Sequence, residues 1–260
     1  MTFFSDFTAE EKERVEAVVS DVDDTITSDG LLYPEALEAL YSLKKNGKRI
    51  ILVTGGSAGW ADTYIRQWPI DAVIAESGAL LLYRKEGGIT YLTNPVISED
   101  ADFEKKRKTL LSMTRNYVFS SDQYARLYDV AYEKRALSKE REERLFEMIE
   151  DLGGTALVSS IHVNVLFSPI SKKKGLDAFF PVLSDSLGIK KDIASFYYSS
   201  LALGDSTNDE ALFSAFSLSV GNKRVYDNIA SFRYLPTYIT NMYGGSSFSY
   251  VISKLLSSCE

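Results

Sequence analysis

Buried-type apolar runs alternate with helix-like patterns over the first 80 or so residues of the chain. Apolar runs at 15–21, 49–54 and 71–75 predict strands, and apolar positions recur at helical spacing from Pro34 to Asn46 and from Ala58 to Trp68. Strands that alternate with helices in this way form mainly parallel sheets. We therefore expect an α/β domain in this part of the chain.

The pattern changes between residues 84 and 169. A hairpin signal at Gly87-Gly88 is followed by charged helices near 98–115 and 138–152 and by short strands of antiparallel type. We expect residues 84–169 to form a smaller α+β domain, inserted into a parallel-sheet core made of residues 1–83 and 170–260.

The strand and helix alternation resumes after this insert. The apolar pattern predicts a helix from Lys174 to Gly188, a strand over 196–203, a helix from Asn208 to Phe216, a strand over 217–221 and a last helix over 247–256.

Acidic residues follow two of the predicted strands. Three carboxylates lie within residues 21–24, directly after the first strand, and Asp205 and Asp209 follow the strand that ends near residue 203. Crowded carboxylates repel one another and are costly to bury unless a cation compensates them, and such oxygen ligands suit Mg²⁺. Because open α/β sheets bind ligands at the carboxyl ends of their strands, we expect both clusters to meet there, together with Thr54.

Composition excludes several classes of function. The chain has 260 residues, 45% of them hydrophobic, and a net charge of −7, which argues against a nucleic-acid or anionic-membrane surface. The pattern of a signal peptide or membrane span is missing, so the expected location is the cytoplasm. The single cysteine, Cys259, predicts neither an internal disulfide nor a cysteine zinc site.

The single histidine, His162, argues against Ser-His-Asp hydrolysis and histidine-rich zinc sites. A strand over 160–167 would place His162 and Asn164 on one face, where the histidine is either structural, the favoured interpretation, or a substrate contact. Acid and base chemistry should therefore fall to carboxylates.

Four motifs in this order resemble those of the haloacid dehalogenase superfamily of phosphotransferases. They are Asp-x-Asp-x-Thr at Asp21, Asp23 and Thr25, the threonine Thr54 after the second strand, a lysine that opens a helix, and Gly-Asp-x-x-Asn-Asp at 204–209. Lysines occupy 172–174, and Lys174 is chosen because Gly175 follows it.

The resemblance implies a Rossmann-like parallel-sheet core with an inserted α+β cap that determines substrate specificity. The cap resembles that of subfamily IIB, the group of Cof-like proteins, sucrose-phosphatases and mannosylglycerate-phosphatases, in which Glu-Asn-Gly-Ala is usual where this chain has Glu76-Ser77-Gly78-Ala79. The chain departs from the family at Asp24, where glycine is usual, and at Gly56, where arginine is frequent. We expect Asp24 to point outward as a turn residue.

The resemblance also implies roles for the motif residues. Asp21 would be the nucleophile, Asp23 the acid and base, and Lys174 would neutralise the phosphoryl group. Phosphate and substrate contacts would come from Thr25, Thr54, Gly55 and Asn208, and Mg²⁺ would be held by Asp21, Asp23, Asp205 and Asp209.

The function implied is a Mg²⁺-dependent phosphatase, a phosphoric monoester hydrolase acting on a small phosphorylated metabolite through an aspartyl phosphate. The favoured substrate is a sugar phosphate. The alternatives are a phosphomutase of the phosphomannomutase type and a non-catalytic binding protein on the same scaffold. The oligomeric state stays open.

Specificity would come from polar residues of the cap. The candidates are Arg126, Arg135, His162 and Asn164, although arginines of such an insert are expected to be solvated. The aromatic-rich stretch 117–132 is expected to form the core of the cap.

Overall fold

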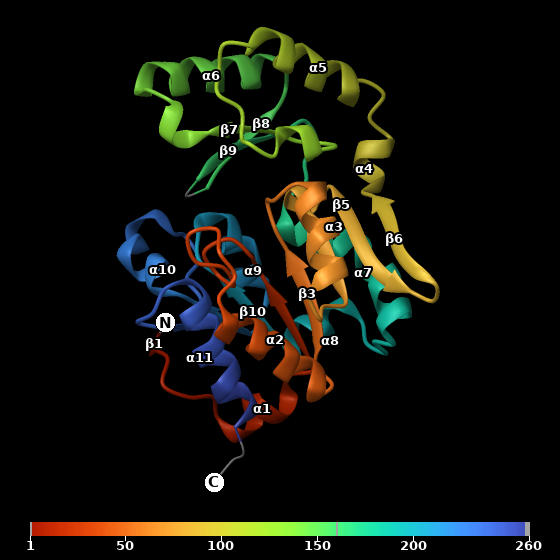
Figure 1. Cartoon of the computed structure of the whole chain (residues 1–260), viewed down its shortest axis with the longest axis vertical. Coiled ribbons are helices and arrows are strands. Elements are labelled where there is room, and N and C mark those ends of the chain that lie inside the picture. The colour runs from red at the N-terminus through yellow and green to blue at the C-terminus, as the bar shows by residue number, and fades with distance from the viewer. Residues whose placement is uncertain (1, 160, 258–260) are drawn as a thin grey trace.

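The computed structural model describes residues 2–159 and 161–257, and within them the chain forms a large lower body and a smaller upper layer (Figure 1). Nine strands of the described chain form one sheet, in the spatial order β1 (Thr2–Phe3), β12 (Tyr238–Ile239), β11 (Leu218–Gly221), β10 (Ser200–Gly204), β2 (Ala17–Ser20), β3 (Arg49–Val53), β4 (Ala72–Ala75), β5 (Leu80–Lys85) and β6 (Gly88–Thr93). The α/β fold class is confirmed. Cys259 lies outside the described residues.

The large sheet is parallel from β1 to β4, and β5 and β6 extend it as an antiparallel hairpin. The register aligns the ends of the three central strands, because Ser20 pairs with Leu203 on one side and with Leu52 on the other. The expected boundary at residue 84 divides β5, and the chain leaves the large sheet only after β6. We therefore propose that the insert begins after residue 93.

Helices cover both faces of the large sheet. Successive side chains along its central strands enter the apolar core on one face and then the core on the other. One apolar core joins the sheet to α2 (Pro34–Lys45), α3 (Ala58–Gln67) and α11 (Gly244–Leu256). The opposite core joins it to α7 (Lys172–Leu187), α8 (Ile193–Tyr198) and α9 (Glu210–Ala215). The remaining helices of the body are α1 (Ala9–Arg14) and α10 (Lys223–Asp227), and its single turns are η1 (Glu76–Gly78), η4 (Thr207–Asp209) and η5 (Ile229–Ser231).

The strand predicted over 196–203 begins later than expected. Asp192 accepts a hydrogen bond from the Ser195 N–H (2.7 Å) and caps α8, which extends to Tyr198. Phe196 and Tyr197 bury their rings from this helix, so the aromatic run ends a helix and the strand starts at Ser200. A short apolar run does not by itself distinguish these two structures.

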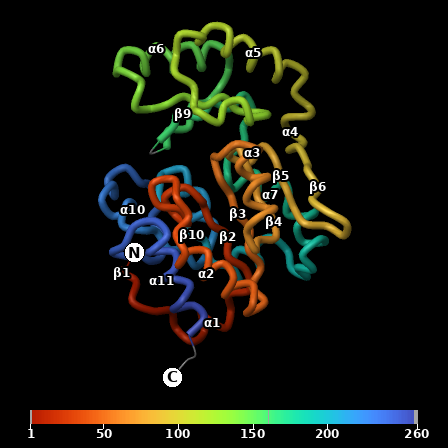
Figure 2. The backbone as a smooth tube through the Cα atoms, viewed as in Figure 1, coloured from red at the N-terminus to blue at the C-terminus, as the bar shows by residue number. Residues whose placement is uncertain are grey.

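Among the described residues, the upper layer is a three-stranded antiparallel sheet with three helices, two of them longer than the third. Its strands are β7 (Val130–Glu133), β9 (His162–Leu166) and β8 (Thr155–Val158), in that spatial order. Its helices are α4 (Pro95–Ser98), α5 (Phe103–Met113) and α6 (Lys139–Asp151), with the turns η2 (Gln123–Ala125) and η3 (Lys134–Ala136). Tyr117 and Tyr132 are buried in its core, as predicted for the stretch 117–132, whereas Tyr124 of the same stretch is exposed. Figure 2 shows the chain entering this layer after β6 and leaving it between β9 and α7.

No helix among the described residues combines the length and the apolar character needed to cross a membrane.

Candidate active site

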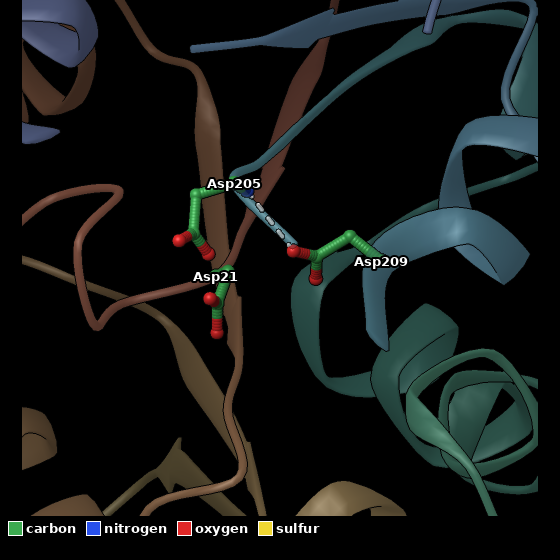
Figure 3. A group of neighbouring side chains, drawn as sticks. All are labelled: Asp21, Asp205 and Asp209. Carbon is green, nitrogen blue, oxygen red and sulfur yellow. Dashed lines mark hydrogen bonds between the residues drawn. The ribbon is translucent and has the colours of Figure 1, made fainter. Parts of the chain in front are cut away.

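Three carboxylates meet at the carboxyl end of the large sheet (Figure 3). Asp21 follows β2 and Asp205 follows β10, and the Asp21 N–H donates to the Leu203 carbonyl of the neighbouring strand (3.0 Å). One oxygen each of Asp21, Asp205 and Asp209 lie within 4.8 Å of one another, and all three residues are buried. We call these three side chains the carboxylate cluster. The parallel register brings the two acidic segments together, as the sequence predicts.

The lysine that joins the cluster is Lys172 rather than the predicted Lys174. The Lys172 Nζ lies 2.7 Å from Asp21 Oδ1 and 2.7 Å from Asp209 Oδ1, and its side chain is 5% exposed. Lys174 is exposed to solvent. The assignment of Lys174 is therefore corrected to Lys172.

Close packing at the start of α7 explains which lysine turns inward. A Cβ added to Gly175 would lie 2.4 Å from the Gly78 Cα, so these two glycines allow α7 to rest directly on η1. Lys172 precedes Gly175 by three residues and shares its side of the helix, whereas Lys174 lies about 160° around the helix from Lys172. Gly175 is thus a packing residue, and helical phase, rather than adjacency to glycine, would have identified Lys172.

Asp209 and Asp205 differ in how their oxygens are used. Asp209 Oδ2 accepts hydrogen bonds from the N–H groups of Asp205 (3.0 Å) and Ser206 (3.2 Å), while Oδ1 receives Lys172. Asp205 Oδ2 is buried and accepts no hydrogen bond from the described residues. Buried carboxylate oxygen without a donor is costly, so the donor set of Asp21 and Asp205 fits a hard cation. The oxygens of Asp209 are already engaged, and the side chain of Asp23 lies outside the cluster.

Burial and mutual repulsion shape the charges of this site. Burial raises the pKa of Asp21 to about 7 against the attraction of Lys172, and Asp209 adds to the rise. Burial also raises the pKa of Asp205 well above its usual range, with a further contribution from Asp21. Burial alone would lower the pKa of Lys172, but the two carboxylates beside it raise that pKa, so the lysine stays cationic.

A cavity of about 40 Å³ lies over the cluster, between the body and the upper layer. From the body it is lined by Asp21, Asp23, Gly55, Lys172, Asp205, Ser206 and Asn208, and from the upper layer by Ser159, Ile161, His162 and Asn164. Asp23 is partly buried, and burial raises its pKa above the usual range although Lys172 opposes this. The strand geometry expected for His162 and Asn164 is confirmed within β9, because both line the cavity while Val163 and Val165 enter the apolar core. Ile161 precedes β9 and lines the cavity as well, so the alternation does not extend to it.

The two predicted threonines lie deeper than the cavity wall. Thr54 is fully buried, and its Oγ1 accepts a hydrogen bond from the Gly56 N–H (2.9 Å). Thr25 is also buried, and its Oγ1 has no hydrogen-bond partner among the described residues. Neither side chain is among the residues that line the cavity.

Asp24 points inward, so the expectation of an outward turn residue is wrong. It is 5% exposed, adopts a left-handed φ of 56° and lies 3.0 Å from an Arg224 nitrogen through Oδ2. The Arg224 Nε lies in turn 3.8 Å from Asp205 Oδ2. Aspartate tolerates this backbone conformation better than most residues, and a distant arginine makes its burial possible.

Sequence reasoning missed a charged network where the upper layer meets the body. Glu76 is fully buried and accepts four backbone N–H hydrogen bonds of 2.7–3.0 Å, from Ala58 in α3 and from the consecutive residues 127–129 of the upper layer. In the sequence, only the position of this glutamate in the Glu-Ser-Gly-Ala segment at 76–79 indicated that it has a special role.

Arg126 forms the other half of this network, and the expectation that it is solvated is wrong. Its side chain is 1% exposed and pairs with Asp122 (3.0 Å) and Asp129 (2.7 Å). It also donates to the Gly55 carbonyl (3.0 Å), to which Asn164 donates as well (3.2 Å). We call Glu76, Asp122, Arg126, Asp129 and Asn164 the junction network. Arg135 is exposed, as expected.

Comparison with known proteins agrees with the first two of the four motifs, which lie within the matched residues. The model of the haloacid dehalogenase-like hydrolase family matches residues 18–158, more than half of the chain. The chain therefore belongs to the haloacid dehalogenase-like hydrolases, as predicted, and is an enzyme of their phosphatase class.

Individual relatives are similar over most of their length. A phosphoglycolate phosphatase of Pyrobaculum islandicum is 27% identical over 213 residues, which cover 80% of this chain and 84% of that protein. Among solved structures, a Thermoplasma acidophilum protein matches with a TM-score of 0.71 at 16% identity, covering 93% of this chain and 98% of the other. The sucrose-phosphatase of Synechocystis matches with a TM-score of 0.58 at 18% identity, covering 93% and 98%. These two likenesses are of fold, and they extend through the inserted layer.

Proposed function

We propose that this chain is a Mg²⁺-dependent phosphatase that hydrolyses a small phosphorylated metabolite through an aspartyl phosphate on Asp21. The observation that carries the proposal is the pair of contacts from Lys172 to Asp21 and Asp209, next to a buried Asp205 oxygen without a hydrogen-bond donor. One fixed cation and one place for a second are what a phosphate dianion needs when it approaches a carboxylate.

Asp21 acts as the nucleophile in this proposal. It lines the cavity, and its contact with Lys172 orients the carboxylate and keeps part of it ionised despite its burial. Attack on phosphorus forms the bond from Asp21 to phosphorus as the ester oxygen leaves, and water then cleaves the acyl phosphate. Division into two steps replaces one difficult displacement by two easier ones.

Lys172, Gly55 and Asn208 line the cavity and are the groups that bind the phosphoryl oxygens. Asp209 positions Lys172 by holding it through Oδ1, while its Oδ2 is held by two backbone N–H groups. Thr54 supports the loop at Gly55 and Gly56 from below through its hydrogen bond with the Gly56 N–H. We call the cavity over the carboxylate cluster the phosphoryl pocket. It is built mainly from groups that are held in place before substrate binds.

Asp21 and Asp205 would hold Mg²⁺, with the Asp23 carbonyl as a further candidate ligand. The ion, when bound, supplies positive charge that neutralises the transferring phosphoryl oxygens.

Asp23 is the proposed general acid and base. It lines the same cavity as Asp21. Burial raises the pKa of Asp23 above its usual range, which favours the protonated form that donates to the departing alkoxide. The same carboxylate, once deprotonated, can accept a proton from the water that attacks the acyl phosphate. This raised pKa suits a group that must act in both directions.

The substrate is proposed to be a phosphate ester with a hydroxylated leaving group, such as a sugar phosphate. Hydroxyl, imidazole and amide groups of Ser159, His162 and Asn164 face the phosphoryl pocket from the upper layer. The similar protein from Pyrobaculum islandicum is named for phosphoglycolate, a phosphate ester of a hydroxy acid that is smaller than a sugar phosphate. This similarity favours a compact leaving group. A cavity of about 40 Å³ accommodates little beyond a phosphoryl group, so substrate entry requires the upper layer to move.

Release of inorganic phosphate from a panel of phosphorylated sugars, hydroxy acids and nucleotides, with and without Mg²⁺, tests the proposal. Asp21→Asn is expected to lower kcat on the order of 10⁴-fold or more, because the amide is a poor nucleophile. Asp29→Asn makes the same substitution at an exposed position of the same loop and should retain activity. Near-normal turnover by Asp21→Asn, or isomerisation of a sugar phosphate without phosphate release, would contradict the proposal.

A further inference from the structure

A second cavity, of about 260 Å³, adjoins the phosphoryl pocket. Ser159, Asp205 and Ser206 line both cavities, so they form a shared wall. The second cavity is the larger of the two and lies between the same two parts of the molecule. A leaving group attached to a phosphoryl group in the first cavity can therefore extend into the second.

Two basic residues line this second cavity from opposite sides. Lys134 comes from η3 of the upper layer, and its Nζ donates to the Ser159 carbonyl (3.2 Å) on the shared wall. Arg224 comes from α10 of the body, and its Nε is buried without a hydrogen-bond partner among the described residues. The anion beside it is Asp205, whose Oδ2 lies 3.8 Å away, beyond hydrogen-bond distance, so this N–H is left for an oxygen that approaches more closely.

The charges around the second cavity leave one positive charge uncompensated. Arg224 is offset by Asp24, which lies 3.0 Å away, and also lies 3.8 Å from Asp205 Oδ2 through its Nε. Lys134 forms no ion pair within the described chain. Asp205 also lines the wall, but it is a proposed ligand of the metal cation. A single free positive charge matches a monoanion such as a carboxylate better than a second phosphate dianion.

The rest of the wall suits a short, hydroxylated carbon chain. Besides the shared wall, it presents the hydroxyls of Thr207 and Ser231, the amide of Asn228 and the apolar surfaces of Val158 and Phe232. Hydroxyl and amide groups can both donate to and accept from alcohols.

We propose that this cavity binds the leaving group of the substrate, and that Lys134 and Arg224 select a leaving group that carries one carboxylate. The substrate class is then a phosphorylated hydroxy acid or sugar acid. This inference rests on the proposed phosphatase function and narrows its substrate. Lys134 and Arg224 contact the carboxylate and take no part in phosphoryl transfer.

A matched pair of substrates tests the selection. Phosphoglycolate and ethylene glycol monophosphate have similar size, but only the first carries a carboxylate. The wild-type enzyme should show kcat/KM about 10- to 100-fold higher for phosphoglycolate, the range expected of a charge-assisted hydrogen bond. Lys134→Gln should bring the two values within a few-fold of each other. Arg135→Gln removes the same charge at the next, exposed position and should leave the ratio unchanged.

A second variant addresses Arg224 without leaving the buried Asp24 unpaired. Arg224→Lys retains the positive charge beside Asp24 but lacks the Nε–H, so the ratio should also fall. Equal kcat/KM values for the two esters in the wild-type enzyme, or an unchanged ratio in both Lys134→Gln and Arg224→Lys, would overturn the inference while phosphate release still supports a phosphatase.

A binding measurement tests the role of the second cavity independently of catalysis. Phosphonopropionate and hydroxypropyl phosphonate mimic the two esters but contain a P–C bond that this chemistry does not cleave. Calorimetric titration in the presence of Mg²⁺ should show tighter binding of phosphonopropionate to the wild-type protein, and Lys134→Gln should abolish the difference. Equal affinities would overturn the inference. Tighter binding of the carboxylate, combined with no phosphate release from any ester, would instead contradict the proposed function alone.

Discussion

The carboxylate cluster and the junction network contain the same kinds of groups, three acidic side chains around one basic residue, yet they are stabilised differently. In the junction network, Glu76 accepts four backbone N–H groups, and Arg126 pairs with both of the other carboxylates. In the carboxylate cluster, Lys172 reaches Asp21 and Asp209, and Asp205 Oδ2 accepts no hydrogen bond within the described chain. A structural network thus meets its needs internally, whereas the site leaves a negative oxygen for something outside the chain.

The largest expected effect is a loss of turnover when Lys172, the lysine that contacts the carboxylate cluster, is replaced. Lys172→Met should lower kcat on the order of 10³-fold, because the phosphoryl oxygens lose a fixed cation in a buried site. Lys174→Met removes the exposed neighbour and should change kcat less than twofold. Steady-state phosphate release, with circular dichroism to verify folding, checks both variants. The reverse order of effects would restore Lys174 as the motif lysine.

Loss of an acceptor in the junction network should act on stability instead. Glu76→Gln replaces one oxygen by an N–H₂ group that faces backbone N–H donors, and we expect the free energy of unfolding to fall by about 2–4 kcal/mol. Urea denaturation measures this change, with exposed Glu86→Gln as the control. Addition of Mg²⁺ should not restore the lost stability, since this network needs no cation. Recovery with Mg²⁺ would remove the distinction between the two regions.

The smallest effect, counted per pH unit, is the pH dependence of the free energy of unfolding without metal. The pKa of Asp21 is raised to about 7 from an ordinary value near 4, so between these pH values the folded state binds more protons than the unfolded state. The free energy of unfolding should therefore fall as pH rises through this window, by at most ~1.4 kcal/mol per pH unit for one such group.

Magnesium distinguishes this slope from a general effect of pH. Saturating Mg²⁺ should reduce the slope, because the cation stabilises the ionised carboxylates of the cluster. The contribution of Glu76, whose pKa burial also raises to about 7, should remain. Asp205→Asn should show a smaller slope and no response to Mg²⁺, since one repelling charge and one proposed ligand are lost together. A slope that Mg²⁺ leaves unaltered in the wild-type protein would argue against a cation at the cluster.

The sequence predicted the parts of the site that depend on strand ends. Asp21, Thr54 and Asp205 each follow a buried apolar run, and parallel strands end at one edge, so their convergence follows from local patterns. The same logic predicted the face of β9 on which His162 and Asn164 lie.

Two of the errors share a physical cause, since they concern side chains that are buried by partners far away in the sequence. Asp24 is buried against Arg224, two hundred residues later, and Arg126 reaches the Gly55 carbonyl of the body in addition to its local partners Asp122 and Asp129. Such long-range contacts arise only from the tertiary fold, and no local pattern encodes them. Lys172 was missed for a different reason, because the interpretation used adjacency to Gly175 instead of helical phase.

The way in which Glu76 holds the upper layer has a consequence for exchanging parts between related enzymes. Its carboxylate accepts hydrogen bonds from the backbone N–H groups of residues 127–129 on that side, so these three bonds can form with different side chains at those positions. Any insert whose loop adopts the same backbone conformation would meet the same anchor. Substrate-recognising segments can therefore diversify, or be transplanted by design, while the glutamate and the body beneath it stay unchanged.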